Sequence, residues 1–244
     1  MSAPIRVAVL GAPGRMGMAV GAAVREDPEL ELVAGIGRND PLSVVIDRGA
    51  EVAVDFTTPG AVKENVRFLL EHEVHAVVGT SGLHEADLAE IARWASESRA
   101  NAFVAPNFAV GAVLMMSFAA RAARYFDRAE IVERHHERKL DSPSGTALRT
   151  AALMNAERSA PWQEGRDDGL PWRGGSEGGV RIHSLRLPGS VAHQEVVLGS
   201  AGETLSIRHD SIDRSSFMPG VVLAIKAVGR RSGLTVGLEA LLEL

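Results

Sequence analysis

The sequence predicts an α/β protein with a Rossmann-like, doubly wound parallel sheet and a smaller α+β domain built on a mixed sheet. Over residues 1–107, short apolar segments alternate with amphipathic helical segments, which is typical of a parallel sheet covered by helices on both sides. A glycine-rich turn follows the first apolar segment, as in nucleotide-binding folds. After residue 181, closely spaced strand-like segments separated by glycine-containing turns indicate a second, antiparallel or mixed sheet.

The first half of the chain shows this alternation element by element. Ile5–Leu10 is a continuous apolar run with one arginine, typical of a strand buried on both faces. The helical segment that follows stops at Asp27-Pro28, and Thr58-Pro59 is a typical N-cap and first position of a further helix. The other expected elements are strands at Leu30–Ile36, Val52–Phe56, Ala76–Val78 and Ala102–Ala105, and a helix at Glu85–Ser98.

The pattern changes in the second half. A long apolar helix, Val110–Phe126, leads into a strand at Ala129–Arg134. Residues 156–181 are rich in glycine, proline, arginine and acidic residues without clear periodicity, so we expect a loop there. The remaining expected elements are strands at Ile182–Leu187, His193–Leu198 and Thr204–His209, and a last helix at Gly220–Arg230.

Composition narrows the possible functions. The net charge of −5 argues against binding through nucleic-acid phosphates, so no nucleic-acid partner is expected. The chain has no cysteine, which excludes disulfides, thiolate metal sites and cysteine nucleophiles. The longest apolar stretch, residues 108–120, is shorter than the roughly 20 residues that span a bilayer. Because the N-terminal residues also lack a signal-peptide layout, we expect a cytoplasmic protein without a membrane partner.

The turn Gly11-Ala12-Pro13-Gly14-Arg15-Met16-Gly17 lies between the first strand and the first helix. Glycines allow a tight turn and a close approach of the backbone to a pyrophosphate, and the helix N-terminus then faces the phosphates. We therefore predict a dinucleotide site. A glycine turn without a ligand is the alternative, because this spacing differs from the commoner G-x-G-x-x-G.

The end of the second strand, Gly37-Arg38-Asn39-Asp40, bears on cofactor preference. A carboxylate usually holds the adenosine ribose at this point, but here the position directly after the strand is glycine. Arg38 can instead face a 2′-phosphate, so we expect NADPH to be used at least as well as NADH. Two alternatives stay open: Asp40 can reach the ribose, and Arg38 can be a solvated loop charge.

The segment His135–Ala147, with the sequence HHERKLDSPSGTA, concentrates the residue types of a small-acid active site. Imidazole exchanges protons near neutral pH, and an ammonium group binds anions. The helix start at Ser144-Gly145-Thr146 offers backbone N–H groups to a carboxylate. No metal site is expected, because adjacent ligands on a strand do not converge well.

Each of these residues also has a purely structural interpretation. Adjacent histidines in an extended segment point to opposite sides, so one of His135 and His136 can be structural. Lys139 can be a solvated charge, and Ser144 can simply cap the following helix. We expect Asp141 to orient the turn. Polar groups in the predicted strands are treated as core or interface residues: His193, His209 and Asp210.

The glycine turn and the histidine–lysine segment together resemble the dihydrodipicolinate reductase (4-hydroxy-tetrahydrodipicolinate reductase) family. The likeness covers nearly the whole chain, and Glu133–Ala147 is its most specific part. Gly37 departs from the family in lacking an acidic side chain, and Ser81 stands where threonine is more common. The other matching segments are Val7–Gly17, Val54–Thr57, Val78–Gly82, Ala105–Phe108, Val191–Glu195 and Arg208–Ser211.

This resemblance implies an NAD(P)H-dependent oxidoreductase that reduces 4-hydroxy-tetrahydrodipicolinate, a small cyclic dicarboxylate, in diaminopimelate and lysine biosynthesis. It implies a Rossmann-like domain formed by residues 1–107 and 217–244, and a substrate-binding and oligomerisation domain at 108–216 that mediates a homotetramer. His135 corresponds to the proposed proton donor and Lys139 to the residue assisting it.

Together with the residue patterns above, the resemblance defines two sets of candidate ligand contacts. The expected substrate contacts are His136, Ser144, Gly145 and Thr146. The expected cofactor contacts are Gly11, Gly14, Arg15, Met16, Arg38, Gly79, Thr80, Ser81, Ala105, Pro106, Asn107 and Phe108.

Two other functions compete with this one. The first is a reductase of another cyclic imine on the same scaffold, and the second is a non-catalytic nucleotide sensor. Nucleotide binding without turnover would support the sensor. A phosphorylating semialdehyde dehydrogenase is excluded, because it requires a cysteine. The sequence also leaves open whether His135 protonates the ring or assists the departure of hydroxide.

Overall fold

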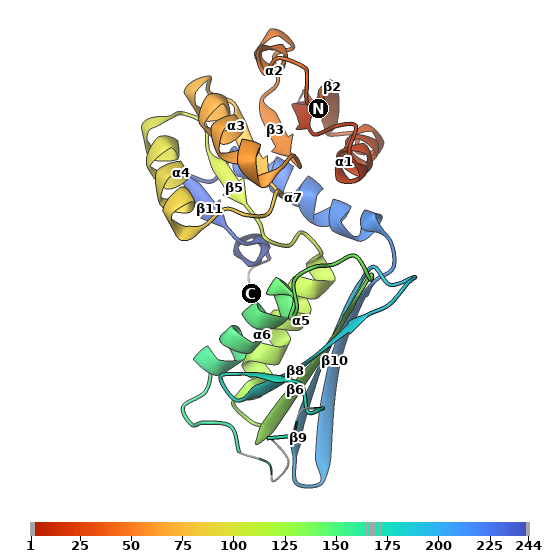
Figure 1. Ribbon diagram of the computed structural model, residues 1–244. Coiled ribbons are helices and arrows are strands. Elements are labelled where there is room, and N and C mark those ends of the chain that lie inside the picture. Colours follow the sequence, from red (N-terminus) through yellow and green to blue (C-terminus); the bar gives the residue numbers. More distant parts are fainter. Residues whose placement is uncertain (1–2, 164, 166–168, 171, 243–244) are drawn as a thin grey trace. The chain divides into compact units, whose positions relative to one another are not determined.

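The computed structural model describes residues 3–163, 165, 169–170 and 172–242. The chain divides into two compact units (Figure 1). The first unit consists of Met1–Val110 and Phe217–Glu243, and the second of Gly111–Ser216. Each unit has its own cluster of buried apolar side chains, so each is built around a separate core.

A parallel sheet forms the centre of the first unit. Among its described residues, six strands lie in the order β11-β5-β4-β3-β1-β2. Because β2 and β3 flank β1 on opposite sides, the strand order reverses at the carboxyl end of β1. The strands are β1 (Ile5–Leu10), β2 (Leu30–Ile36), β3 (Val52–Asp55), β4 (His75–Val78), β5 (Ala102–Val104) and β11 (Leu234–Val236).

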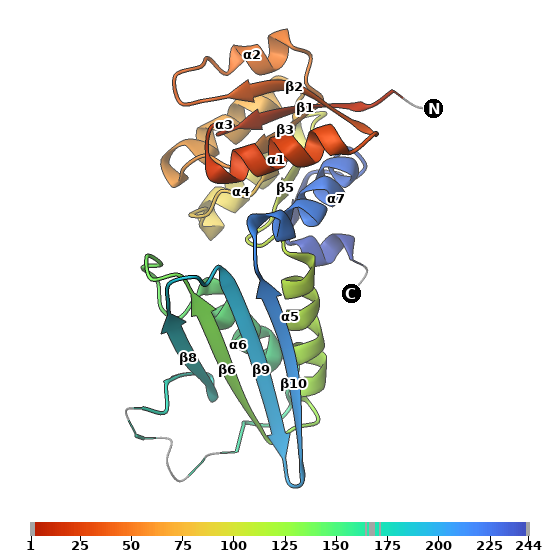
Figure 2. The ribbon, with the colours of Figure 1, turned by 90° about the vertical axis from the view of Figure 1, so that its right-hand side faces the viewer.

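Helices cover this sheet on both faces, as expected for a Rossmann-like fold. Figure 2 shows α1 and α7 together on one face, with α3 and α4 on the other. All four residues of β3 are buried, which explains why three of them are apolar, and the fourth, Asp55, is the last residue of the strand. The helices are α1 (Arg15–Glu26), α2 (Ser43–Asp47), α3 (Pro59–Glu71), α4 (Glu85–Glu97) and α7 (Met218–Val228), with short 3-10 turns at Arg214–Phe217 and Leu238–Leu241.

The second unit packs two helices on one face of a mixed sheet (Figure 1). In its described residues, five strands lie in the order β10-β9-β6-β8-β7. Strands β6 and β8 run parallel, and the other neighbours are antiparallel, so the expected mixed sheet is confirmed. The elements are α5 (Val110–Ala123), β6 (Arg128–His135), α6 (Gly145–Ala156), β7 (Gly175–Glu177), β8 (Val180–Arg186), β9 (Ala192–Ser200) and β10 (Glu203–Ser211).

The expectation of a continuous loop at residues 156–181 is wrong in its last part. Strand β7 pairs there with β8 through a turn at Gly178-Gly179, in which both residues have positive φ. The residues of β7 are exposed and have no apolar alternation, so only the pairing with β8 defines the strand. Positions 164, 166–168 and 171 of the expected loop lie outside the described residues.

Two further elements of the first unit were not expected, helix α2 and strand β11. Strand β11 extends the parallel sheet by pairing with β5. Helix α2 has only five residues and β11 only three, which is too short for a periodic pattern to show. No helix in the described ranges is long and apolar enough to cross a bilayer.

Candidate active site

The glycine turn between β1 and α1 leaves no room for side chains at two positions. Gly11 has φ of +79°, and a Cβ atom there would lie 2.4 Å from the carbonyl oxygen of Phe56. A Cβ atom at Gly17 would lie 2.1 Å from the carbonyl oxygen of Gly11. The Gly14 N–H also donates to the Gly11 carbonyl at 2.9 Å. Glycine is therefore required at both ends of the turn.

The N-terminus of α1 can accept an anion. Gly14 is the N-cap residue, so no side chain caps the helix, and its first turn has no acidic residue. Arg15 is exposed and Met16 is half-buried. The first backbone N–H groups of a helix have no partner within the helix, which makes this turn suitable for a phosphate group.

A cavity of about 500 Å³ lies beside this turn, at the carboxyl ends of β1, β2 and β3. This is the switch point of the sheet, where open α/β folds bind ligands. The cradle formed by Gly11 and Gly17 and the uncapped helix fit the phosphates of a dinucleotide, and the cavity fits its adenosine end. Its lining includes Gly11, Gly14, Gly37, Arg38, Asp40 and Phe56.

Arg38 and Asp40 differ in how they are held. The Asp40 carboxylate accepts a hydrogen bond from the Gly37 N–H at 2.7 Å. Arg38 is exposed and forms no hydrogen bond or ion pair with another part of the described chain. Its guanidinium is thus available to a ligand in the cavity, whereas the Asp40 carboxylate is partly used in closing the turn.

Asp55, at the end of β3, joins two of the loops that border this site. Its fully buried carboxylate accepts hydrogen bonds from the backbone N–H of Thr57 at 2.9 Å and the hydroxyl of Thr80 at 2.7 Å. It also accepts one from the Asn65 amide at 2.8 Å. The Gly79 N–H donates to the Asp55 carbonyl at 3.0 Å. Asp55 therefore fixes the start of the Gly79–Ser81 loop, a role that its place in the Val54–Thr57 motif did not reveal.

The loop at residues 105–108, which follows β5, offers mainly backbone groups to a ligand. Ala105 and Phe108 are 2% and 3% exposed, so their side chains belong to the core. The Ala105 N–H donates to the Val78 carbonyl at 3.0 Å, and the Asn107 side chain accepts from the Ala109 N–H at 2.9 Å. Pro106 is exposed. A ligand at this loop would therefore contact peptide groups, Pro106 or Asn107.

In the second unit, His135 lies at the carboxyl end of β6 beside a buried ion pair. Its Nδ1 is 2.6 Å from Oε2 of Glu133, whose side chain is fully buried. Arg186 of β8 donates to both oxygens of this carboxylate, each at 2.8 Å. The parallel register of the two strands pairs His135 with Arg186, which explains why these residues meet.

The charges around His135 shift two pKa values. Burial raises the pKa of Glu133, but hydrogen bonds from Arg186, Ser184 and His135 together lower it by more than burial raises it. The pKa of Glu133 therefore lies below its ordinary value. Burial holds the pKa of His135 below its ordinary value, and Glu133 opposes this, while Lys139 and Arg186 reinforce it. At neutral pH Glu133 is therefore a carboxylate, and His135 gives up a proton readily.

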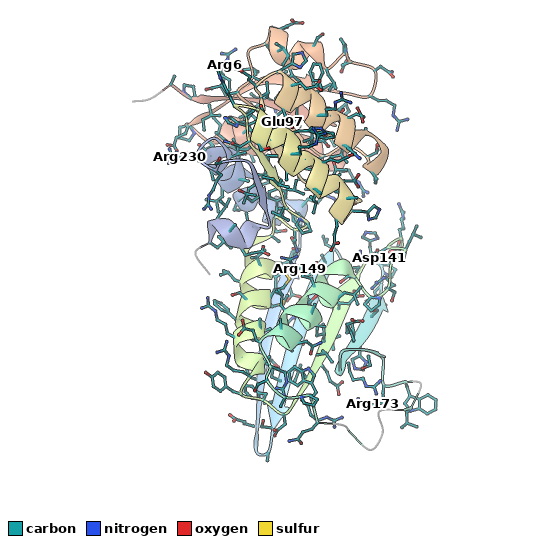
Figure 3. All side chains as sticks on the ribbon, turned by 90° about the vertical axis from the view of Figure 1, so that its left-hand side faces the viewer. Arg6, Glu97, Asp141, Arg149, Arg173 and Arg230 are labelled. Atoms are coloured by element: carbon teal, nitrogen blue, oxygen red, sulfur yellow. The ribbon has the colours of Figure 1, made fainter. Side chains whose placement is uncertain are left out.

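Lys139 and Asp141 form an ion pair in the loop after β6. The ammonium group lies 2.7 Å from Oδ1 of Asp141, and a hydrogen bond from Lys139 holds the pKa of that carboxyl below its ordinary value. The Lys139 N–H donates to the His136 carbonyl at 3.1 Å, which closes the turn. Arg186 also donates to the Asp141 carbonyl at 2.6 Å. Figure 3 shows Asp141 in this loop, beside the end of the sheet.

Helix α6 begins where this loop ends. Ser144 is its N-cap, and its hydroxyl accepts a hydrogen bond from the Ala147 N–H at 3.2 Å, so the capping interpretation is confirmed. The Cβ position of Gly145 faces open space, and Thr146 is half-buried. The first turn of α6 is therefore accessible to a ligand, and capping by Ser144 does not block it.

The structure brings the candidate residues together in two groups, one in each unit. His135, Lys139 and Ser144 gather around Glu133 and Arg186 in the second unit, and the nucleotide-binding candidates line the first unit. The polar strand residues have structural partners, since His193 pairs with Asp210 at 2.6 Å and His209 packs against Gly111.

The first unit is Rossmann-like with a dinucleotide cradle, and the second is a mixed-sheet unit with a histidine–lysine cluster. This combination is that of a two-domain oxidoreductase of the nicotinamide-dependent class. Profiles of the dihydrodipicolinate reductase N-terminus and C-terminus match residues 5–108 and 111–242. The chain belongs to the dihydrodipicolinate reductase family, and the resemblance noted in its sequence is confirmed.

Individual relatives are similar to this chain over nearly its whole length. The 4-hydroxy-tetrahydrodipicolinate reductase of Nocardia farcinica is 52% identical, with 98% of this chain and 99% of the relative covered. That of Streptomyces griseus is 50% identical, with 98% of each covered. A dipicolinate-bound dihydrodipicolinate reductase from Paenisporosarcina sp. TG-14 has a TM-score of 0.84 at 36% identity, with 97% and 99% covered.

Proposed function

We propose that this protein reduces 4-hydroxy-tetrahydrodipicolinate to tetrahydrodipicolinate with loss of water, using NAD(P)H, in diaminopimelate and lysine biosynthesis. The observation that carries the proposal is the grouping of His135, Lys139 and the open start of α6 around one buried ion pair. Relatives at about half identity bear the name of this activity. The structural neighbour bound to dipicolinate supports a cyclic dicarboxylate as the substrate class.

The second unit would bind the dicarboxylate through three groups. The N–H groups of Gly145 and Thr146 at the accessible helix start would bind one carboxylate. His136 and Lys139 would add donors and positive charge around the substrate. Lys139 would then exchange its ion pair with Asp141 for one with the substrate, and both groups are sufficiently exposed for this.

His135 would supply the proton. Burial lowers its pKa, so the imidazolium releases a proton more easily than an ordinary histidine does. The proton either completes the reduction of the ring or assists the departure of hydroxide. Lys139 would assist by orienting the substrate, and its charge favours the neutral imidazole that remains after transfer.

The first unit would hold the cofactor, which supplies a hydride when bound. Gly11, Gly14, Arg15 and Met16 would surround its phosphates at the start of α1. The loops at Gly79, Thr80 and Ser81 and at Ala105, Pro106, Asn107 and Phe108 would enclose its nicotinamide end. Arg38, which lines the cavity without a protein partner in the described chain, favours NADPH at least as much as NADH.

A steady-state assay tests the function directly. Freshly generated 4-hydroxy-tetrahydrodipicolinate is offered with NADPH and with NADH, and oxidation of each nucleotide is followed separately. We expect fast turnover with NADPH. Tight NADPH binding without turnover would contradict the proposal and favour a sensor. Turnover of a different cyclic imine alone would favour the other reductase.

A homotetramer in the cytoplasm is also part of the proposal. The face of the second sheet opposite α5 and α6 carries the part-exposed apolar side chains Val132 and Leu185, which a partner subunit would cover. Analytical ultracentrifugation gives the assembly mass. A monomer at micromolar concentration would contradict this part without affecting the proposed reaction.

A further inference from the structure

We propose that Glu133 is a positioning residue for this reaction, and that its carboxylate, braced by Arg186, fixes both the tautomer of His135 and the start of helix α6. The inference rests on the proposed function, because it assumes that His135 exchanges a proton with the substrate. It adds a residue that contacts neither substrate nor cofactor but sets the geometry of two groups that do.

Both oxygens of the Glu133 carboxylate are used. Oε2 accepts from Nδ1 of His135 at 2.6 Å and from Nη1 of Arg186 at 2.8 Å. Oε1 accepts from Nη2 of Arg186 at 2.8 Å and from the backbone N–H of Ser144 at 3.2 Å. A fully buried carboxylate is stable only when it is paired and hydrogen-bonded in this way. The Glu133 carboxylate is therefore held in one position, and it holds His135 and Ser144 in turn.

The carboxylate determines which nitrogen of His135 carries the mobile proton. An ionised carboxylate only accepts hydrogen bonds, so Nδ1 must carry hydrogen whether the ring is neutral or charged. The proton that is gained and lost is then the one on Nε2. Without Glu133, the ring could take the other tautomer, and Nε2 of the neutral ring would no longer be ready to accept a proton.

The same carboxylate organises the helix that would bind the substrate carboxylate. Its Oε1 accepts from Ser144, the N-cap of α6, directly before Gly145 and Thr146. Arg186 also connects the Glu133 carboxylate to the loop that carries Lys139 and Asp141, because its Nη2 donates a hydrogen bond to the Asp141 carbonyl. A change at Glu133 would therefore disturb the proton donor and the anion-binding helix together.

The chain contains a matched control on the same strand. Glu130 also pairs with one histidine and one arginine, His183 and Arg173. Its side chain lies on the opposite face of β6 and is 34% exposed. Figure 3 shows Arg173 well away from the loop that carries Asp141. Glu130→Gln thus removes a similar charge cluster without touching the proposed site, and its assembly mass is measured as well, because Glu130 shares its face of the sheet with Val132.

The first test compares Glu133→Gln and Glu130→Gln in the full-length enzyme. We expect Glu133→Gln to lower kcat by about 10–100-fold, the loss that follows removal of a carboxylate that orients a metal-bound histidine, while the NADPH dissociation constant is unchanged. We expect Glu130→Gln to stay within about twofold of wild type, as for a distant site. Equal losses in both variants, or none in Glu133→Gln, would overturn the proposal.

The pH profile of kcat separates positioning from general loss of stability. Glu133 raises the pKa of His135, whereas Lys139 and Arg186 lower it, and Asp141 is paired with Lys139. In Glu133→Gln the remaining positive charges dominate, so the limb on which activity falls as pH rises should move to lower pH. An unmoved limb would contradict the proposal.

A measurement on the wild-type protein does not depend on turnover. The ¹⁵N chemical shifts of the His135 ring, assigned with a His135→Gln variant, report its tautomer. We expect neutral His135 to carry hydrogen on Nδ1, and the opposite tautomer would overturn the inference even in an active enzyme. If the assay shows no turnover but the ring is in the Nδ1–H form, the proposed function fails while the positioning by Glu133 stands. This measurement also decides the matter if Glu133→Gln fails to fold.

Discussion

At the scale of single residues, Arg38 is the side chain that should set cofactor preference. Its guanidinium lines the cavity after β2, and Asp40 is already bonded to the Gly37 backbone. Arg38→Ala should raise the KM for NADPH by roughly 10–150-fold, because one charged hydrogen bond to the 2′-phosphate is worth about 1.5–3 kcal/mol. The KM for NADH should be unchanged. Equal increases for both nucleotides would contradict a contact with the 2′-phosphate, and no change in either KM would show that Arg38 is a solvated charge.

His135 and Lys139 should determine turnover without affecting nucleotide binding. A general acid contributes roughly 10²–10⁴-fold to rate, so His135→Ala should lower kcat by that order, and Lys139→Ala by a comparable factor. Because both residues lie in the second unit, the NADPH dissociation constant, measured by fluorescence titration, should stay near that of wild type. His72→Ala, at the exposed C-cap residue of α3, is the control. Near-normal turnover in a double variant of His135 and Lys139 would refute the assignment.

Single residues also show where sequence reasoning fails. His135, Lys139 and Ser144 were identified because their side-chain chemistry is evident and they are close in the chain. Glu133 lies in the same segment, but its role depends on Arg186, which only the register of β6 and β8 brings next to it. Asp55 depends in the same way on Thr80 of a neighbouring loop. Contacts between distant parts of the chain leave no local pattern.

At the scale of elements, the turn between β1 and α1 should not tolerate a side chain at Gly11. In Gly11→Ala the new Cβ would meet the Phe56 carbonyl at 2.4 Å in a residue with φ of +79°. Such strain costs about 1–3 kcal/mol, and if the turn shifts to relieve it, we expect NADPH to bind roughly 5–150-fold more weakly. Gly60→Ala is the control, because a Cβ there meets nothing within 4 Å. Unchanged NADPH affinity in Gly11→Ala, measured by calorimetry, would show that this turn is not the nucleotide site.

The elements that could be predicted are those whose burial dictates the type of residue at each position. The central strands of the first sheet are buried on both faces, so their sequences are apolar apart from Arg6 near the start of β1 and Asp55 at the end of β3, and they are easy to recognise. The short strands β7 and β11 exist because an adjacent strand, β8 or β5, offers a free edge. Their own residues carry little preference, and the sequence could not indicate them.

At the scale of the whole molecule, acid should destabilise the second unit first. Glu130 and Glu133 have lowered pKa values, so their stabilisation is present above about pH 4.5 and is lost as pH falls through their folded pKa values. Burial also lowers the pKa of His135 and His209, so the unfolded chain takes up protons first as pH falls below 6.5. The first unit has one such histidine, His75, among the described residues.

Hydrogen exchange can measure this difference. Between pH 7.5 and 4.5, after correction for intrinsic exchange rates, amides of β6 and β8 should lose more protection than those of β3. His135→Gln should reduce the effect, because the histidines are the groups that titrate in this pH range. Loss of protection at the same pH in both units, or first in β3, would contradict the prediction.

Much of the molecular architecture could be anticipated from the order of the elements. Alternating strands and helices predicted the parallel sheet, and the change of pattern after residue 107 predicted a second, mixed sheet. The strand order of that sheet could not be anticipated, because β6 pairs with both β8 and β9 across long separations in the chain. The family resemblance supplied the reaction, which no architectural argument provides.

The two ends of the loop between His135 and Ser144 are bonded to one carboxylate, and this has a consequence for chain length. An insertion or deletion between these residues would pull one donor away from Glu133. The turns at Gly189 and Gly202 have no such constraint, since even an added Cβ would meet nothing within 4 Å. Length differences between homologous enzymes should therefore collect at those turns, which are also the safer places to insert a tag or a reporter peptide.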